Sequence, residues 1–403
     1  MSNVSAATVL AIRDFRLYLA ARFLGGLAQM MVTVSVGWLV YDLTRDPLHL
    51  GYVGLAQFLP AFALTLTGGQ VADRVSRRLI LQCCLGVSVA AVLTLLAIAL
   101  HPAPEVAWIY AVMAVMGAVR AFFAPAAQSL APQLVDRDIL PRALALGSSA
   151  WQASVIAGPA LGGMLYALGP AVVFGSAATL LLLALAAVTA LKPPPAVRTT
   201  LASGGFFEGV KFVWSRPEII GSVSLDLFAV LLGGATALLP VYARDILHTG
   251  PVGLGLLRSA PALGATLVAI ALANRPIERA AGIKLFVAVG LFGLATVTFG
   301  LSTSFGLSLA ALVLLGAADM VSVVLRQTLV QLNTPDEMRG RVSAVNLVFI
   351  GASNELGEFE SGLTAAWFGT VPAVVIGGVG TLAVAAIWAW RFPALRRFDR
   401  LKG

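Results

Sequence analysis

Residues 69–78 read GQVADRVSRR, and residues 79–100 continue as LILQCCLGVSVAAVLTLLAIAL. The first stretch is a short polar segment with three arginines and one aspartate, whereas the second carries no charged side chain. A helix needs about 20 consecutive apolar residues to cross the hydrocarbon core of a bilayer. The pair of stretches therefore predicts a membrane-crossing helix that begins directly after a basic turn.

The same alternation of apolar runs and short polar turns extends over the whole chain of 403 residues. Hydrophobic residues make up 59% of the chain, charged residues make up 11%, and the mean hydropathy is +0.91. Soluble domains carry about 25% charged residues, because their surface must face water. The composition excludes an ordinary soluble enzyme, a disordered protein and a small disulfide-stapled secreted domain. It predicts an all-α integral membrane protein.

The polar minority of the chain is basic, with a net charge of +8. Nucleic-acid binding is not expected, because the basic residues do not form a patch interleaved with aromatic side chains. The two cysteines, Cys83 and Cys84, are neighbours within an apolar run, so we expect them to pack rather than to bridge the fold. The short polar amino terminus does not have the pattern of a cleavable signal peptide.

Twelve apolar stretches are long enough to cross the bilayer. Their predicted limits are 16–41, 50–72, 79–100, 105–131, 143–168, 171–191, 218–243, 252–273, 283–301, 305–330, 342–368 and 371–390. The connections are short except for 192–217, which opens with a lysine and three prolines. We therefore expect an N-terminal six-helix bundle at 1–191, a cytoplasmic linker at 192–217, and a C-terminal six-helix bundle with a short basic cytoplasmic tail at 218–403.

The distribution of basic residues orients these spans. If the amino terminus lies inside, only Arg45 and Arg244 fall in outer connections, and the inner segments hold all other arginines and lysines outside the spans. Basic residues are enriched on the cytoplasmic side of membrane proteins. The sequence therefore predicts a multi-pass protein of the cell membrane, of the bacterial inner membrane type, with both termini in the cytoplasm.

The linker contains one amphipathic segment, residues 204–214. Phe207, Val210 and Trp214 share one helical face there, while Glu208 and Lys211 lie elsewhere. This pattern predicts a short helix that lies on the inner membrane surface. A plain soluble linker is the alternative interpretation.

The two halves of the chain resemble each other. At an offset of 199 residues, Gln128 aligns with Gln327, Arg142 with Arg341, Gly158 with Gly357 and Gly163 with Gly362. These matches and the six spans in each half predict two parallel bundles related by an axis along the membrane normal. Transporters of that build place their substrate site between the bundles, near the midplane of the bilayer.

The turn at 69–78 combines a glycine, an acid four residues later and a cluster of arginines. A glycine permits close helix approach, and the acid can face a helix amino terminus or pair with an arginine; a simple basic loop is the alternative. The segment resembles the loop signature of the major facilitator superfamily, G-x-x-x-D-R-x-x-R-R, and the resemblance covers nearly the whole chain. It implies that Gly69, Asp73, Arg74 and Arg78 form a gating motif that stabilises the outward-open state. The second half holds a degraded copy.

The fifth span contains residues 154–163, which read SVIAGPALGG. They resemble the antiporter signature of exporters in that family, G-x-x-x-G-P-x-x-G-G, with serine in place of the first glycine. The resemblance implies an antiporter-like motif at Gly158, Pro159, Gly162 and Gly163, and it favours export over uptake. Small residues and a proline also serve ordinary helix packing and kinking, which is the alternative interpretation.

Nine ionisable residues fall within the predicted spans, and each costs about 2.5–3.5 kcal/mol at a helix centre. We therefore expect them to face one another or a wet cavity rather than lipid. They are Arg22, Arg120, Asp226, Arg258, Asp319, Arg326, Glu355, Glu358 and Glu360. In the fold that the resemblance implies, the first, fourth, seventh and tenth helices line a central cavity. Each of those helices carries one of these charges, namely Arg22, Arg120, Asp226 and Asp319.

Two interpretations of these charges remain open. In the first, arginines hold anionic groups of a substrate and carboxylates take up protons or bind cationic groups. Dehydration and a neighbouring like charge favour the neutral form of a carboxylic acid, so Glu355 or Glu358, which share a helix face, is expected to exchange protons. In the second, the charges form ion pairs between helices or within one, as Asp319 and Arg326 could.

The predicted function is secondary active transport, namely proton-coupled export of small organic molecules of drug or siderophore type by alternating access. Residues 353–360, SNELGEFE, further resemble the branch of the family that holds bacterial enterobactin exporters and drug exporters. A facilitator or importer of a small metabolite on the same fold is the alternative. We expect a small-molecule substrate and protons as partners, no cofactor, and a monomer, as is usual for the family.

An enzyme is not expected. The sequence contains no phosphate-binding G-x-x-x-x-G-K-[ST], no H-E-x-x-H and no G-x-S-x-G. All three histidines fall in predicted outer connections, so we expect no buried histidine-based catalytic site and no metal site.

Overall fold

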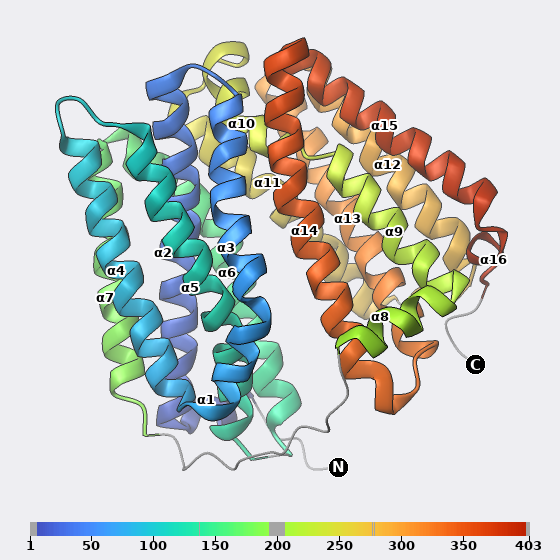
Figure 1. The fold of residues 1–403 in the computed structure, drawn as a ribbon, viewed down its shortest axis with the longest axis horizontal. Coiled ribbons are helices and arrows are strands. Elements are labelled where there is room, and N and C mark those ends of the chain that lie inside the picture. Colours follow the sequence, from blue (N-terminus) through green and yellow to red (C-terminus); the bar gives the residue numbers. More distant parts are fainter. Residues whose placement is uncertain (1–5, 137, 193–205, 276, 278, 400–403) are drawn as a thin grey trace. The chain divides into compact units, whose positions relative to one another are not determined.

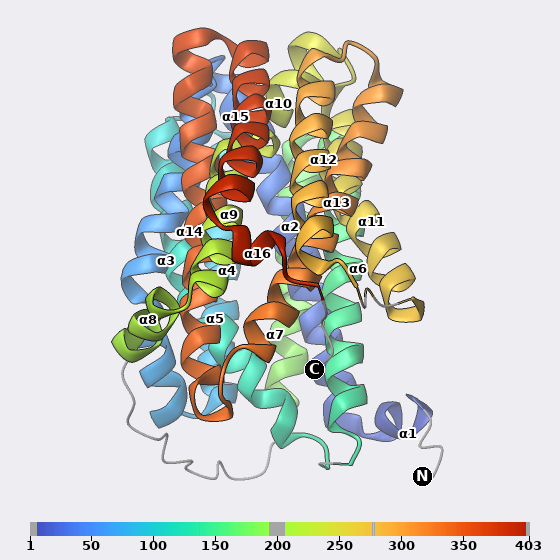
Figure 2. The same ribbon diagram turned by 90° about the vertical axis from the view of Figure 1, so that its right-hand side faces the viewer.

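The computed structural model describes residues 6–136, 138–192, 206–275, 277 and 279–399. Within these ranges the chain forms helices and turns, and no β-strand occurs. Each of the twelve predicted spans coincides with a helical segment (Figure 1 and Figure 2). The predicted all-α membrane fold is therefore confirmed. Most of the predicted linker, residues 193–205, lies outside the described ranges.

The first half begins with the short helix α1, Ala6–Ala11, and continues with six long helices. These are α2 Arg13–Thr44, α3 Leu48–Arg74, α4 Arg77–Leu100, α5 Val106–Leu130, α6 Leu140–Ala167 and α7 Pro170–Thr189, with a 3₁₀ turn, η1 Ala131–Gln133, after α5. Ser76 lies within the basic segment 69–78 and directly precedes α4, and its Oγ accepts a hydrogen bond of 3.3 Å from the backbone N–H of Leu79. This cap satisfies one of the free amides at the start of α4.

The second half opens with the amphipathic helix α8, Phe206–Ser215, and then repeats the pattern of long helices. They are α9 Pro217–Leu232, α11 Gly250–Asn274, α12 Ala281–Leu301, α13 Phe305–Leu332, α14 Asp336–Phe368 and α15 Thr370–Arg391, followed by the short α16 Pro393–Arg396. The seventh span is not one continuous helix. It breaks at Gly233 and Gly234, since two consecutive glycines destabilise a helix, and continues through η2 Ala235–Leu238, α10 Leu239–Val241 and a π-helical turn, η3 Tyr242–Ile246.

The tight turns that precede α7 and α15 use the same device. Gly169 has a φ angle of 126° and Gly369 has a φ angle of 88°. Glycine adopts such positive φ angles without the steric cost that other residues meet. The two glycines lie 200 residues apart, which is within one residue of the offset of the internal repeat.

Ten helical segments within the described residues are long and apolar enough to cross a membrane. Helices α6 and α14 are just as long but more polar, because α6 is rich in glycine and serine and α14 carries four glutamates. They are the fifth and eleventh spans, which the repeat relates to each other. These two helices also carry the antiporter-like motif and the candidate glutamates.

The helices of the two halves pack in the same pattern. Helix α2 packs against α6 and α7, and α4 packs against α5 and α7. Correspondingly, α9 packs against α14 and α15, and α12 packs against α13 and α15. The first, third, fourth, fifth and sixth spans of each half therefore make equivalent contacts. The repeat that the sequence shows only in scattered matches is clear in the helix packing.

The described residues divide into two compact units. Among the described residues, the first unit draws on 6–45, 56–136, 138–192 and 250–259, and the second on 46–55, 206–249, 260–275, 277 and 279–399. The first turns of α3 and α11 therefore group with the opposite half of the sequence, which the predicted boundaries do not include. The two exchanged segments, 46–55 and 250–259, are equivalents in the repeat, since both contain the start of a second span within their half.

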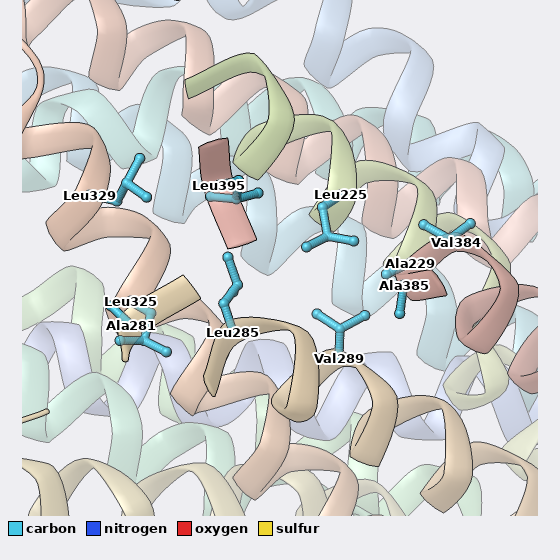
Figure 3. Close-up of a cluster of buried hydrophobic side chains, with 10 residues drawn as sticks. All are labelled: Leu225, Ala229, Ala281, Leu285, Val289, Leu325, Leu329, Val384, Ala385 and Leu395. Carbon is cyan, nitrogen blue, oxygen red and sulfur yellow. The ribbon is translucent and has the colours of Figure 1, made fainter. Parts of the chain in front are cut away.

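The second unit has an apolar core that the end of the chain helps to fill. Its members are Leu225, Ala229, Ala281, Leu285, Val289, Leu325, Leu329, Val384, Ala385 and Leu395 (Figure 3). Leu395 of α16 is fully buried in this core. The carboxylate of Asp399 accepts a hydrogen bond of 2.9 Å from the backbone N–H of Ala280, just before α12. Residues 393–399, which belong to the predicted short basic cytoplasmic tail, therefore fold back onto the helices.

Candidate functional site

An ion pair lies inside the second unit, between α9 and α13. The Oδ1 atom of Asp226 contacts Nη1 of Arg326. Asp226 is 8% exposed and Arg326 is 2% exposed. Two opposite charges at this depth neutralise each other, whereas either one alone would carry a large desolvation penalty. The pair joins the seventh and tenth spans, both of which the family resemblance predicts to line a central cavity.

The Asp226–Arg326 pair corrects the interpretation in which Asp319 and Arg326 neutralise each other. The sequence offers Asp319 as a partner for Arg326, because both lie on one face of the tenth span. They are seven residues, or about 10 Å, apart along the helix axis, whereas Asp226 lies across from Arg326 on α9. Within the part of the chain that the structure describes, no hydrogen bond or ion pair is formed by the Asp319 side chain.

Asp319 lines a small cavity in the second unit together with Asp226 and Ser322. The cavity has a volume of about 10 Å³, which is close to the space that one water molecule needs. The remaining wall is apolar and consists of Ala229, Val230, Ala288, Val289, Phe292 and Ala318. The Asp226–Arg326 pair is already neutral, so no cation among the described residues of the cavity wall compensates a negative charge on Asp319. A proton that binds to Asp319 removes this charge.

The apolar core of the second unit adjoins this ion pair. Leu225 and Leu325 directly precede Asp226 and Arg326 in the sequence, and both are buried members of the core (Figure 3). Ala229 and Val289 belong to both the core and the cavity wall. The core therefore separates the paired charges from water on that side, which strengthens their mutual attraction.

Arg22, in the first unit, is held by neutral acceptors. Its Nε donates to the carbonyl oxygen of Gly147 on α6 at 2.9 Å, and its Nη1 donates to the hydroxyl of Tyr18 at 3.4 Å. Tyr18 in turn donates to the carbonyl oxygen of Ala127 on α5 at 3.0 Å. Among the described residues, Arg22 has no carboxylate partner. The guanidinium group therefore keeps an uncompensated positive charge where α2, α5 and α6 meet.

Arg120 lies near the same depth of the first unit. It precedes Ala127 by seven residues on α5, so the two residues share a helix face about 10 Å apart. Arg22 follows Tyr18 by four residues, or about 6 Å, on the antiparallel helix α2. The two arginines are therefore separated by roughly 5 Å along the helix axes. Arg120 is exposed in the structure.

Helix α14 carries the three candidate glutamates. Glu355 is 9% exposed. The Oε2 atom of Glu358 lies 3.2 Å from the position that a Cβ on Gly54 of α3 would occupy. Glu360 points elsewhere, as predicted from the spacing, and accepts a hydrogen bond of 2.7 Å from the hydroxyl of Thr364. Glu358 and the first turns of α3 therefore lie together, within the second unit.

The gating motif at 69–78 has a packing role that the sequence did not indicate. A Cβ on Gly69 would meet nothing within 4 Å, whereas a Cβ on Gly68 would strike the carbonyl oxygen of Ala121 on α5. The close helix approach predicted for Gly69 is therefore made by Gly68. Arg78 donates through Nη2 to the carbonyl oxygen of Thr189, the last residue of α7, and so caps that helix.

The other two motif residues are less informative. Arg74 ends α3 and is exposed. The side chain of Asp73 lies outside the described part of the structure.

The antiporter-like motif packs α6 closely against two other helices. A Cβ on Gly158 would strike the side chain of Met30 on α2, and one on Gly162 would lie 2.9 Å from the Cα atom of Met31. A Cβ on Gly163 would strike the carbonyl oxygen of Pro251 at the start of α11. The backbones can approach this closely only because the positions lack side chains. Pro159, the remaining motif residue, is buried between them.

Three residues around these motifs were missed by the sequence analysis. Ser154, which replaces the first motif glycine, donates through Oγ to the carbonyl oxygen of Phe23 on α2 at 2.9 Å, so it joins the same two helices by a hydrogen bond. Tyr18 orients Arg22, and its position four residues earlier on the same face was an available signal. Gly68 directly precedes Gly69 in the sequence, but only the packing shows that Gly68 is the glycine that permits the close approach of α3 and α5.

Metal and disulfide chemistry find no support in the described ranges. No group of three or more histidine, cysteine, aspartate or glutamate side chains is placed there to hold a metal ion. Cys83 is exposed and Cys84 is buried, and both are free thiols.

Comparison with known sequences relates the chain to transporters. The model of the Major Facilitator Superfamily matches residues 18–358. The chain is 28% identical over 397 residues to the protein named Enterobactin exporter EntS of Citrobacter koseri, with 95% of this chain and 93% of that protein covered. It is 27% identical over 403 residues, with the same coverage, to the protein of that name from Escherichia coli O139:H28.

Comparison with solved structures relates the fold to transporters as well. A bacterial homologue of the human lysosomal transporter Spinster, in an inward-facing and unoccupied conformation, superposes with a TM-score of 0.71 at 15% identity, covering 98% of this chain and 97% of that chain. A POT family transporter in complex with 5-aminolevulinic acid superposes with a TM-score of 0.76 at 10% identity, covering 95% and 97% of the two chains. At these identities the likeness establishes the fold alone.

Proposed function

Because this chain belongs to the Major Facilitator Superfamily, as the match over residues 18–358 establishes, we propose that it is a proton-coupled exporter of small organic molecules and not an enzyme. Export is supported by the antiporter-like segment at 158–163 and by relatives that are named enterobactin exporters. We assign the protein to the cell membrane as a monomer with both termini in the cytoplasm. Its two bundles are 1–191 and 218–403.

Proton coupling rests on one observation, the uncompensated carboxyl group of Asp319 beside a neutral ion pair. Arg326 is engaged by Asp226, so it does not stabilise a charge on Asp319 as a direct partner. The cavity next to Asp319 is large enough for about one water molecule, which is the kind of group that can exchange a proton with the carboxyl group. We therefore place the exchangeable proton on Asp319 in preference to Glu355 or Glu358, which the sequence favoured.

The substrate that fits the first unit carries anionic groups. Arg22 holds a positive charge that only neutral acceptors contact among the described residues. We propose that Arg120, which lies at a similar depth along the helix axes, adds a second positive charge to this region. Siderophores of the kind named for the relatives, and acidic drugs, are the substrate classes that we propose.

The transport cycle follows from alternating access. A ligand shifts a conformational equilibrium only by the difference in its affinity for the two states. Binding of a proton at Asp319 favours one state, and its release after the change of access restores the other. Gly69, Asp73, Arg74 and Arg78 act as the gating motif in this cycle, and Gly158, Pro159, Gly162 and Gly163 keep α6 in close contact with its neighbours.

The test is transport by the purified full chain in liposomes with an imposed pH gradient. A fluorescent organic anion serves as the probe substrate, and its flux is followed with and without the gradient. We expect wild-type flux to rise with the gradient and Asp319→Asn flux to ignore it. Flux of the wild-type protein that ignores the gradient would remove proton coupling and leave a facilitator.

The matched control is Glu355→Gln, which removes another buried acid of the second unit. This variant is expected to keep its response to the gradient if Asp319 carries the proton. A response lost in Glu355→Gln and kept in Asp319→Asn would move the proton site to α14. Arg22→Gln tests the substrate class separately, because it should reduce flux of an anionic probe while the flux of a cationic probe stays at or above the wild-type level.

A further inference from the structure

Helix α8, at the start of the second unit, has one side fixed to α14. Val213 is 1% exposed and packs in a cluster with Val342 and Val345. A Cβ on Gly209 would lie 2.9 Å from the carbonyl oxygen of Arg341, so the two backbones are in close contact. Figure 1 shows α8 lying across one end of α14. This side of α8 is therefore a protein interface.

An ion pair strengthens that interface. Nη1 of Arg341 lies 2.5 Å from Oε2 of Glu208. The Glu208 side chain is 59% exposed and that of Arg341 is 26% exposed, so water screens the pair in part. The acid of α8 is nonetheless engaged by a cation from α14. It does not neutralise the basic residues on the other side of the helix.

The opposite side of α8 is aromatic and basic. Lys211 and Trp214 are three residues apart, and both lie on the half of the helix surface that points away from Gly209 and Val213. Trp214 is 67% exposed, and Lys211 is exposed as well. Arg216 follows at the bend into α9 and is also exposed. We refer to Lys211, Trp214 and Arg216 as the α8 patch.

The residues of the predicted amphipathic face do not all have the same environment in the structure. Val210 packs against the buried cluster that contains Val213, whereas Trp214 remains exposed. The side chain of Phe207 lies outside the described part of the structure. Trp214 is therefore exposed on the same side of α8 as Lys211, while the guanidinium group of Arg216 lies 5.6 Å from the centre of the Phe212 ring.

We propose that the α8 patch binds the headgroups of anionic phospholipids in the cytoplasmic leaflet. Tryptophan is enriched at the interface between bilayer and water, where its ring is partly buried and its N–H stays hydrated. Lysine and arginine beside it attract the phosphate and the net negative charge of such lipids. The distribution of basic residues places this linker on the cytoplasmic side. The charge of the patch thus complements that leaflet.

Lipid bound at the α8 patch also acts on the transport helices of the second unit. Glu208 and Gly209 fix α8 to Arg341, which lies near the start of α14. Helix α14 continues from there to Glu355 and Glu358. An anionic lipid that holds α8 at the membrane surface therefore holds the first turns of α14 with it.

The test uses the full chain reconstituted in phosphatidylcholine vesicles, with or without brominated phosphatidylglycerol. Bromine quenches the fluorescence of nearby tryptophans, and the difference between wild type and Trp214→Phe isolates Trp214 from the other six tryptophans. We expect Trp214 to be quenched more strongly by brominated phosphatidylglycerol than by brominated phosphatidylcholine at the same mole fraction. The preference should weaken about fivefold for each patch cation removed, as Lys211→Gln or Arg216→Gln.

The matched control is Lys284→Gln, since Lys284 is another exposed lysine at the start of a long helix of the same unit. This variant should keep the full preference for phosphatidylglycerol. Equal quenching by both lipids would overturn the proposal, and so would an equal loss of preference in Lys284→Gln. Quenching by neither lipid would show that Trp214 faces water or a soluble partner, which also overturns it. None of these outcomes depends on whether the protein exports a substrate.

Discussion

Asp226→Asn should strongly destabilise the second unit. The substitution leaves the guanidinium of Arg326, 2% exposed, without its counter-charge. At an effective dielectric constant of 20, two unit charges 4 Å apart attract by about 4 kcal/mol. Removal of one partner from a buried pair costs about 3–5 kcal/mol. For a domain of 150–250 residues, this corresponds to a fall in melting temperature of about 6–20 °C.

The assay is thermal unfolding of the purified protein followed by tryptophan fluorescence. Trp388 of α15 is a suitable reporter, because its Nε1 donates to the hydroxyl of Ser224 on α9 at 2.9 Å, close to Asp226 in the sequence. The double variant Asp226→Asn with Arg326→Gln should recover much of the loss, since it removes both charges of the pair and leaves neither one without its partner. A single variant that melts within about 2 °C of wild type, corresponding to less than about 1 kcal/mol, would refute this account. A double variant less stable than the single one would refute it as well.

Three further predictions concern other sites. Gly68→Ala should lower the free energy of unfolding by about 1–3 kcal/mol, because the added Cβ strikes Ala121. Gly69→Ala should be neutral or stabilising by up to about 1 kcal/mol. The melting temperatures of the two variants test this difference, and equal losses would contradict the packing. Asp319→Asn should melt at or above the wild-type temperature, because it removes an uncompensated charge. Transport by this variant should no longer respond to a pH gradient. Unfolding of this variant would show that Asp319 is structural. Arg22→Lys should keep more affinity for an anionic probe than Arg22→Gln in equilibrium binding, because lysine retains the charge, and equal affinities would assign Arg22 to packing alone.

The sequence predicts much of the fold because a bilayer imposes simple rules. Spans must be apolar and about 20 residues long, and basic residues gather on one side. These rules locate all twelve helical segments. They do not foresee the break at Gly233 and Gly234, because an apolar run containing two glycines still has the hydropathy of a span.

The candidate site is only partly predictable, and the reason is the direction of side chains across helices. The sequence identifies Asp226, Asp319 and Arg326 as intramembrane charges that need partners. Spacing along one helix suggests that Asp319 and Arg326 pair, but the partner of Arg326 comes from α9. Periodicity fixes which residues share a face of one helix. It carries no information about which neighbouring helix lies opposite that face.

What the sequence determined by itself is the environment of the chain, the number of its helices and the family to which it belongs. These properties depend on composition and local spacing, which act residue by residue. Tertiary structure alone decided that Gly68 rather than Gly69 meets α5, that Arg326 is neutralised while Asp319 is not, and that Trp214 stays exposed while Val213 is buried. Each of these outcomes depends on contacts between residues far apart in the chain, which local composition and spacing do not specify.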